Sequence, residues 1–221
     1  VEVIGDKPID EVTKMDVDKF KGVRKSQLSA VSVNIQLRTL RAAFNLAVRW
    51  EMIEKNPFTR VQQFRIPEAS PTYLTFDQFN LLRMTMADHW IRDIVIFAVY
   101  TGLRKSEILN LEWRHVDMKR NVIHVTSTET FKTKAGKSRI VPLNEAALSV
   151  LAGCQTGHQY VFTYKDKRVD THSLTHAFKR MTRAAGLPEA IHFHSLRHTF
   201  ASWLVQDGVS LFQVGKLLGH S

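Results

Sequence analysis

The stretch Arg65-Ile-Pro-Glu-Ala-Ser-Pro-Thr72 decides how this chain folds, because it separates two different patterns of sequence. Pro67 and Pro71 stand four residues apart, and proline is not tolerated inside a regular helix. We therefore predict two domains, a small helical one over residues 1–66 and a larger one over residues 67–221.

On the N-terminal side of this boundary, one strong helical pattern runs roughly over Val33–Glu54. Apolar residues recur with the spacing of a buried stripe. Polar residues repeat with the same period on a neighbouring face, which carries no acid before Glu51. A charged helix face is commonly only solvated, but such a face normally mixes both signs. We therefore predict a helix lying along DNA and contacting phosphates and base edges. The predicted DNA-contacting residues of this helix are Arg38, Arg41, Asn45 and Arg49.

On the C-terminal side, we predict a mainly α domain with one small antiparallel β-sheet. A capping box at Thr75–Gln78 and a glycine stop at Gly102 mark two helix ends. The expected helices are Trp90–Tyr100, Lys105–Trp113, Asn144–Leu151, Ser173–Ala185, Ser195–Gln206 and Ser210–Leu218. The expected strands are Asn121–Val125, Thr130–Lys134 and Arg139–Leu143, with a turn at Ala135–Lys137.

Composition narrows the class of protein. Hydrophobic residues make up 44% and charged residues 24% of 221 residues, which excludes a disordered chain. The formal net charge of +10 and the pI near 9.9 favour a nucleic acid partner. The longest apolar run, Ile94–Tyr100, is too short to span a membrane. A single cysteine, Cys154, excludes an internal disulfide and fits the cytoplasm.

Two separated segments offer cations for a phosphate. In Thr101-Gly-Leu-Arg-Lys-Ser-Glu107, Arg104 follows a glycine turn at a helix start, where anions bind favourably, and Glu107 is placed to hold it. A plain surface ion pair is the alternative. The second segment, 132–139, is a predicted basic hairpin whose lysines are able to contact phosphate or donate a proton. A hairpin that only adds non-specific attraction is equally consistent. Its bases are Lys132, Lys134, Lys137 and Arg139.

Two further segments carry histidines. In His192-Phe-His-Ser-Leu-Arg-His198, we expect His194 and Arg197 about one turn apart at a helix start. His194 and His198 have the spacing of a zinc helix, but Ser195 stands where the zincin pattern needs Glu, so we predict no metal site. A packed pair of histidines is the simpler alternative. The last segment, Leu217–Ser221, places His220 after a helix-ending glycine.

These four segments resemble, in order and spacing, the motifs of tyrosine recombinases, specifically the integrases of phages and genomic islands. Thr101–Glu107 resembles the first motif, and Lys134 lies eight residues before Pro142, as in the family. The run His194–His198 resembles the HxLRH signature, and Leu217–His220 resembles the last motif. Residues 32–58 also resemble the core-binding domain of that family.

The resemblance implies a core-binding domain over 1–66 and a catalytic domain over 67–221. It implies that a tyrosine attacks a DNA phosphate to give a 3′-phosphotyrosyl bond, with no cofactor and no metal. Arg104 and Arg197 would hold the non-bridging oxygens, and Lys134 would protonate the leaving 5′-oxygen. His194 would assist proton transfer, and His220 would hydrogen-bond the phosphate. The implied partners are double-stranded attachment-site DNA, three further copies in a homotetramer, and DNA-bending accessory proteins. The implied location is the cytoplasm, for a bacterial or phage-encoded protein.

One departure qualifies this prediction. The family's nucleophilic tyrosine falls about nine residues past the histidine that His220 matches, so none of Tyr73, Tyr100, Tyr160 and Tyr164 fits the motif. We therefore expect both ends to be truncated, with the first core-binding helix missing, and DNA binding without cleavage. The alternatives are a non-catalytic DNA-binding protein on the same fold and a zinc metalloenzyme.

Overall fold

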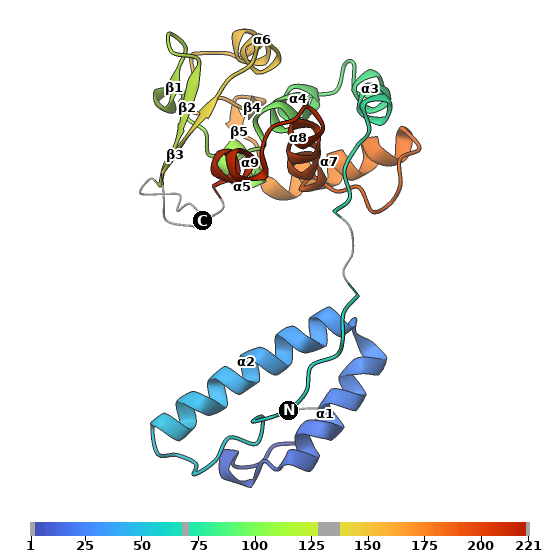
Figure 1. The fold of residues 1–221 in the computed structure, drawn as a ribbon, viewed down its shortest axis with the longest axis vertical. Helices are drawn as coiled ribbons and strands as arrows, with labels where there is room; N and C mark the ends of the chain where they lie inside the picture. The colour runs from blue at the N-terminus through green and yellow to red at the C-terminus, as the bar shows by residue number, and fades with distance from the viewer. Residues whose placement is uncertain (1–2, 68–70, 128–137, 220–221) are drawn as a thin grey trace. The chain divides into compact units, whose positions relative to one another are not determined.

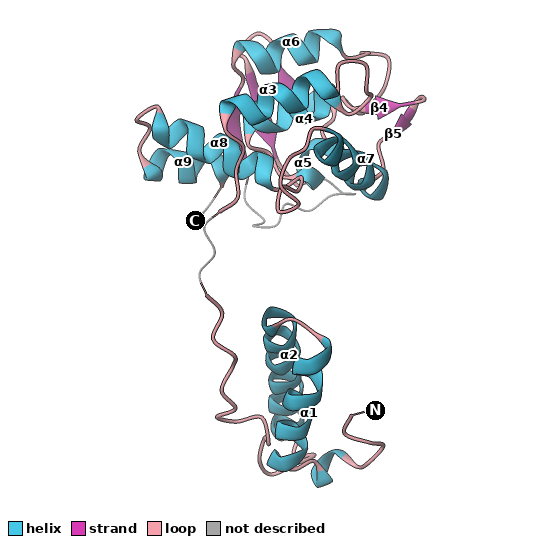
Figure 2. Ribbon diagram, turned by 90° about the vertical axis from the view of Figure 1, so that its right-hand side faces the viewer, coloured by secondary structure: helices cyan, strands magenta, loops and turns pink. Residues whose placement is uncertain are grey.

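The computed structural model describes residues 3–67, 71–127 and 138–219. The chain divides into two compact units, Val1–Ala69 and Ser70–Ser221 (Figure 1). Helices dominate both units, and the described strands all belong to the second (Figure 2). The predicted fold class, mainly α with small antiparallel sheets, is confirmed. Among the described residues no helix is both long and apolar enough to cross a bilayer.

The first unit is built from two packed helices and a returning segment, which is the chain that follows the second helix and runs back along it. The helix α1 begins after Thr13, whose side chain accepts the backbone N–H of Asp16 while the Asp16 carboxylate accepts that of Thr13. Both helices bury a narrow apolar stripe, which includes Val17 and Leu37. The elements are η1 (Ile9–Glu11), α1 (Lys14–Gln27) and α2 (Ala30–Arg49).

Polar side chains, of which Asn34 and Asn56 are buried, hold the returning segment along α2. The Asn34 amide bonds both the N–H and the C=O of Phe64, at 2.8 Å each. The Arg41 guanidinium donates to the carbonyls of Phe58, at 3.1 Å, and Val61, at 2.6 Å. Asn56 donates to the side chain of Asn45 at 2.6 Å. Each bond satisfies a polar group that the packing would otherwise leave unpaired.

One predicted helix of the first unit is wrong in extent, and one observed helix was not predicted. The helix expected to reach Glu54 ends at Arg49, because Glu51 adopts a left-handed backbone with φ of 58° that stops the helix. The helix α1, Lys14–Gln27, was not predicted from the sequence. Its sequence is polar, and only Val17 and Phe20 are buried, so its apolar periodicity is weak.

The second unit packs around α4, in which seven of ten residues are buried. Helices α6 and α8 both pack against it, and the sheet lies to one side of this helical group (Figure 1). The helices are α3 (Phe76–Thr85), α4 (Arg92–Thr101), α5 (Lys105–Leu109), α6 (Glu145–Gly153), α7 (Thr171–Ala184), α8 (Ser195–Gln206) and α9 (Leu211–Leu218), with a 3-10 turn η2 (Trp113–His115).

A three-stranded antiparallel sheet has the order β1-β2-β3, with Ile123 opposite Val141 in its buried layer. Its strands are β1 (Val116–Asp117), β2 (Val122–Val125) and β3 (Arg139–Pro142), and a second ribbon pairs β4 (Thr163–Tyr164) with β5 (Lys167–Arg168). The strand and turn predicted over 130–137 lie outside the described residues.

Most predicted ends in the second unit are close to those observed. The Thr75 capping box is present, and α8 has the predicted bounds. The helix predicted over Lys105–Trp113 is wrong in extent, because α5 ends at Leu109 and the chain turns through η2 into β1.

Candidate active site

The carboxylate of Glu107 is the centre of a cluster of cations in the second unit. Its side chain is only 2% exposed. Oε1 accepts hydrogen bonds from Arg104 and from Arg139, both at 2.9 Å. Oε2 accepts the second N–H of Arg139 at 2.6 Å and the backbone N–H of Arg104 at 2.8 Å. The i, i+3 contact between Arg104 and Glu107 is therefore the one predicted, and Arg139 adds a bidentate bond.

A glycine turn places Arg104 at this carboxylate. Gly102 ends α4 in the left-handed region with φ of 62°, so the chain reverses and α5 begins immediately after Arg104. A Cβ on Gly102 would collide with the ring of Phe200 in α8. Close packing of α8 on this turn therefore requires glycine for two reasons, its conformation and its lack of a side chain.

Arg197 joins the cluster from the first turn of α8. It is only 4% exposed and donates to the carbonyl of Gly102 at 2.7 Å and to the carbonyl of Leu218. Arg139 similarly donates through Nε to the carbonyl of Leu217 at 3.0 Å. The two arginines thus hold the C-terminal end of α9 against the turn that positions Arg104.

The pKa values show that these groups share one electrostatic environment. Burial first, and then the charges of Arg104 and Arg139, lower the pKa of Arg197 to about 10, while Glu107 opposes them. Burial alone would raise the pKa of Glu107, but hydrogen bonds from Arg139 and Arg104 outweigh it, and the pKa lies below its ordinary value. Three guanidinium groups against one carboxylate leave a net positive charge, which favours an anion.

His194 lies at the edge of the same cluster. It occupies the position before α8, and its pKa is lowered by burial first and then by His198, Arg197, His192 and Arg104. The ring is therefore neutral at pH 7 and able to accept a proton when an anion offsets the nearby cations. The rings of His194 and His198 meet edge to face, with centroids 5.0 Å apart.

The structure therefore brings together five of the predicted site residues, Arg104, Glu107, Arg139, His194 and Arg197. Four others lie outside the described residues, namely Lys132, Lys134, Lys137 and His220. The residues just before His220 nevertheless contact the cluster. The carbonyls of Leu217 and Leu218 accept bonds from Arg139 and Arg197, and the Arg139 side chain lies against Gly219.

Arg139 makes contacts that the sequence did not predict. We expected it to contact DNA from a hairpin, but its guanidinium is committed to Glu107 and Leu217, and its side chain is 11% exposed. Its partner Glu107 lies 32 residues away in the sequence. A contact between residues so far apart in the sequence leaves no spacing pattern from which it could be predicted.

Two of the predicted DNA-contacting residues of α2 also have internal partners. Arg41 holds the carbonyls of Phe58 and Val61, and Asn45 accepts the Asn56 amide. Arg38 and Arg49 are exposed, and among the described residues no ion pair is assigned to either. Exposed cations of this kind are what a phosphate contact requires, so Arg38 and Arg49 stay predicted DNA contacts.

The four tyrosines of the chain lie in four different environments. Tyr100 packs edge to face against Phe79 in the core, and Tyr164 stacks on Trp90 at 4.7 Å. Tyr160 pairs with Glu112 in an isolated bridge. Tyr73 is 39% exposed just before α3.

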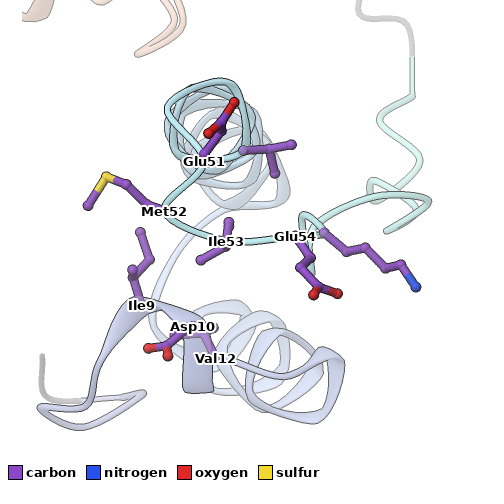
Figure 3. A pocket seen from close by; sticks show the side chains of 9 residues that line it. Ile9, Asp10, Val12, Glu51, Met52, Ile53 and Glu54 are labelled. Atoms are coloured by element: carbon purple, nitrogen blue, oxygen red, sulfur yellow. The ribbon is translucent and has the colours of Figure 1, made fainter.

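The first unit contains an open cavity of about 750 Å³, but its charge does not suit a phosphate. Figure 3 shows Ile9, Met52 and Ile53 lining it. The charged residues in its lining are Asp10, Glu51, Glu54 and Lys55, so acids outnumber bases. The cationic cluster around Glu107 is therefore the better candidate for an anionic substrate.

Several characterised proteins are similar in sequence. The integrase of Salmonella phage P22 is 32% identical over 79% of this chain and 47% of its own length. The shufflon-specific DNA recombinase of Escherichia coli is 28% identical over 96% of this chain and 56% of its own length. The tyrosine recombinase XerC of Pediococcus pentosaceus is 28% identical over 95% of this chain and 74% of its own length. The chain thus spans about half the length of the first two relatives.

Solved structures show the same fold. The Tn1549 transposon integrase in complex with transposon right end DNA has a TM-score of 0.81 at 25% identity, covering 98% of this chain and 80% of that one. A lambda integrase tetramer bound to a Holliday junction has a TM-score of 0.84 at 20% identity, covering 100% of this chain and 67% of that one. Residues 72–221, about two thirds of the chain, match the model of the phage integrase family, to which this chain therefore belongs.

Proposed function

We propose that this chain binds double-stranded DNA and holds one backbone phosphate in the cleavage and rejoining reaction of a site-specific tyrosine recombinase. The observation that supports the proposal is the cluster in which Arg104, Arg139 and Arg197, from three distant segments, surround the single carboxylate of Glu107. A phosphodiester gains negative charge on its non-bridging oxygens in the transition state. Preorganised cations stabilise that charge without reorganising during the reaction.

Each residue has a proposed role. Arg104 and Arg197 bind the non-bridging oxygens, and Glu107 and Arg139 keep Arg104 and the end of α9 in position. His194, neutral when the site is empty, takes up a proton as the phosphate becomes more negative. Lys134 protonates the leaving 5′-oxygen, and His220 hydrogen-bonds the phosphate, as the family motifs imply.

The wider partners follow from the relatives. The P22 relative is named an integrase, the Escherichia coli relative is named a shufflon-specific DNA recombinase, and the lambda integrase structure is a tetramer bound to a Holliday junction. We propose that this chain likewise acts on DNA as a homotetramer. From the resemblance of its motifs to the family, we also propose double-stranded attachment sites as the DNA, DNA-bending accessory proteins as partners, and the cytoplasm as the location. Arg38 and Arg49 supply phosphate contacts from α2.

The tyrosine positions support a further part of the proposal. Tyr100 is committed to the core, and Tyr164 to its stack on Trp90. We infer that these 221 residues bind DNA but form no covalent bond to it by themselves. The same observation favours a second candidate, a DNA-binding protein that keeps the fold without strand transfer.

Binding of orthovanadate, a phosphate-like oxyanion, tests the proposed phosphate site. We expect one vanadate to raise the melting temperature of the chain, because ligands that bind the folded state stabilise it. Arg104→Ala should weaken this binding by about tenfold or more, since a hydrogen bond to a charged group contributes roughly 1.5–3 kcal/mol. Arg197→Lys keeps the buried charge but loses the forked donors, and should weaken it similarly.

The control is Arg38→Ala, which removes an equal charge from the first unit and should leave vanadate binding unchanged. Equal vanadate affinity in the parent chain and in Arg104→Ala would contradict the phosphate site. That result, together with intact DNA binding, would favour the non-catalytic candidate.

A further inference from the structure

Two histidines on the outer face of α7 form a pair that the proposed reaction does not use. His172 and His176 are both exposed and are separated by one helical turn. Their Nε2 atoms lie 3.0 Å apart, and their ring centroids lie 4.1 Å apart at an interplanar angle of 47°. Both rings therefore present the same nitrogen to the same point beside the helix.

The helix itself fixes this pair in place. The Asp170 side chain accepts the backbone N–H of Ser173 at 2.8 Å and caps the first turn. Leu174 and Phe178 are buried on the opposite face, which sets the rotation of the helix. Thr175, between the two histidines, accepts a hydrogen bond from Lys105 of α5 at 2.8 Å. The two rings are therefore held on a supported helix rather than on a loop.

We propose that His172 and His176 form a binding site for one divalent transition-metal ion. Neutral imidazole is a common ligand of Zn²⁺, Ni²⁺ and Cu²⁺, with a metal–nitrogen distance of about 2.0–2.1 Å. Two nitrogens 3.0 Å apart at that distance subtend an angle of roughly 90° at the metal. That angle suits adjacent positions of octahedral Ni²⁺ or tetragonal Cu²⁺ better than tetrahedral Zn²⁺.

Neighbouring charges modulate this site without blocking it. Asp170 lies close enough to His172 for the two to interact electrostatically. The cations one turn further along have partners of their own, because Lys179 pairs with Glu189 and Arg180 with His89. Among the described residues no group of three or more metal-ligating side chains occurs, so water fills the other positions on the metal.

The second histidine pair of this chain is a matched comparison. His194 and His198 have the same i, i+4 spacing, but their rings stand at 88° with centroids 5.0 Å apart. Burial first, and then charged neighbours that include Arg197 and Arg104, lower the pKa of His194, and these two cations oppose a metal ion. The two pairs therefore have the same sequence spacing, but ring geometry and nearby charge favour metal binding by His172 and His176.

Calorimetric titration of the untagged chain with Ni²⁺, Cu²⁺ and Mg²⁺ tests the proposal. We expect one Ni²⁺ or Cu²⁺ to bind at pH 7.5, with Cu²⁺ tighter, no binding of Mg²⁺, and marked weakening at pH 5.5 as imidazole protonates. His172→Ala and His176→Ala should each weaken Ni²⁺ binding by about tenfold or more. His194→Ala should leave it unchanged.

Both substitutions on α7 are at exposed positions, so the variants should fold, and circular dichroism checks this. Ni²⁺ affinity that persists in His172→Ala, or that is lost in His194→Ala instead, would overturn the site. These outcomes are independent of vanadate or DNA binding, so they leave the proposed function to be judged separately.

Discussion

At the scale of single residues, Glu107 explains how three arginines share one small region. The three guanidinium groups repel one another, and burial adds a desolvation cost for the charged form of Arg197. A carboxylate that accepts bonds from two of them offsets part of that repulsion. The remaining positive charge is then available to a substrate anion.

Arg139 is the residue whose removal should damage this arrangement most directly. Arg139→Ala leaves Glu107 buried without its bidentate partner, so we expect the free energy of unfolding to fall by about 3 kcal/mol. Urea denaturation followed by tryptophan fluorescence measures the loss.

The matched control is Arg120→Ala, whose exposed ion pair with Asp117 spans 3.8 Å. This change should cost less than about 1 kcal/mol. Equal costs for the two substitutions would show that the Arg139 contacts contribute nothing specific.

The protonation of His194 gives a second prediction at this scale. Burial and neighbouring cations hold its pKa below the ordinary value, so the free ring is neutral at pH 7. A bound oxyanion favours the charged ring and should raise the pKa of His194. Histidine NMR titrations with and without vanadate measure the shift, with the half-buried His158, which lies outside the cluster, as the reference ring. An unchanged or lower pKa would place the anion away from His194.

Residue-level predictions succeeded where the partners are neighbours in sequence. The contact between Arg104 and Glu107 follows from their i, i+3 spacing in a helix turn. The contacts of Arg139 and Arg41 did not follow from any pattern. Both depend on partners that only the tertiary fold brings near, 32 and 17 to 20 residues away.

At the scale of elements, the turn between α4 and α5 connects the fold to the site. Gly102 ends α4, contacts Phe200 and offers its carbonyl to Arg197. Gly102→Ala adds both a left-handed strain of about 1–2 kcal/mol and an overpacking cost of about 1–3 kcal/mol. We expect the free energy of unfolding to fall by the sum of these costs, and vanadate binding to weaken.

Gly186 provides the comparison for this prediction. It has a similar φ of 64°, but an added Cβ meets no atom within 4 Å. Gly186→Ala should therefore cost only the conformational part, about 1–2 kcal/mol, and leave vanadate binding intact. Equal costs at the two glycines would contradict the close approach of α8 to the turn.

Element boundaries were predictable where the sequence carries a cap. The capping box at Thr75 and the glycines after α4 and α9 marked their helix ends. The end of α2 was not predictable, because a non-glycine residue, Glu51, adopts the left-handed conformation there. The polar helix α1 lacked the apolar periodicity on which the prediction depended.

At the scale of the whole molecule, a net charge of +10 predicts salt-sensitive binding to DNA. Arg38→Ala and Arg49→Ala should each lower the salt-dependence slope by about 1 if each residue contacts one phosphate. Arg41→Ala should instead destabilise the first unit, because Arg41 holds two backbone carbonyls. Fluorescence anisotropy over a salt series measures the slopes, and an unchanged slope in Arg38→Ala would remove that residue from the interface.

The division into two units and the order of motifs were visible in the sequence, because prolines and short motifs are local signals. The convergence of Arg104, Arg139 and Arg197 was not derivable from spacing, since it depends on how α4, α8 and β3 pack. The resemblance of four motifs to one family supplied that expectation for Arg104 and Arg197, but not for Arg139.

A structure of this chain bound to duplex DNA tests the central claim most directly. We predict one backbone phosphate within hydrogen-bonding distance of the Arg104 and Arg197 guanidinium groups, with the His194 ring beside it. A complex in which these three side chains contact different phosphates, or contact no phosphate, would contradict the account.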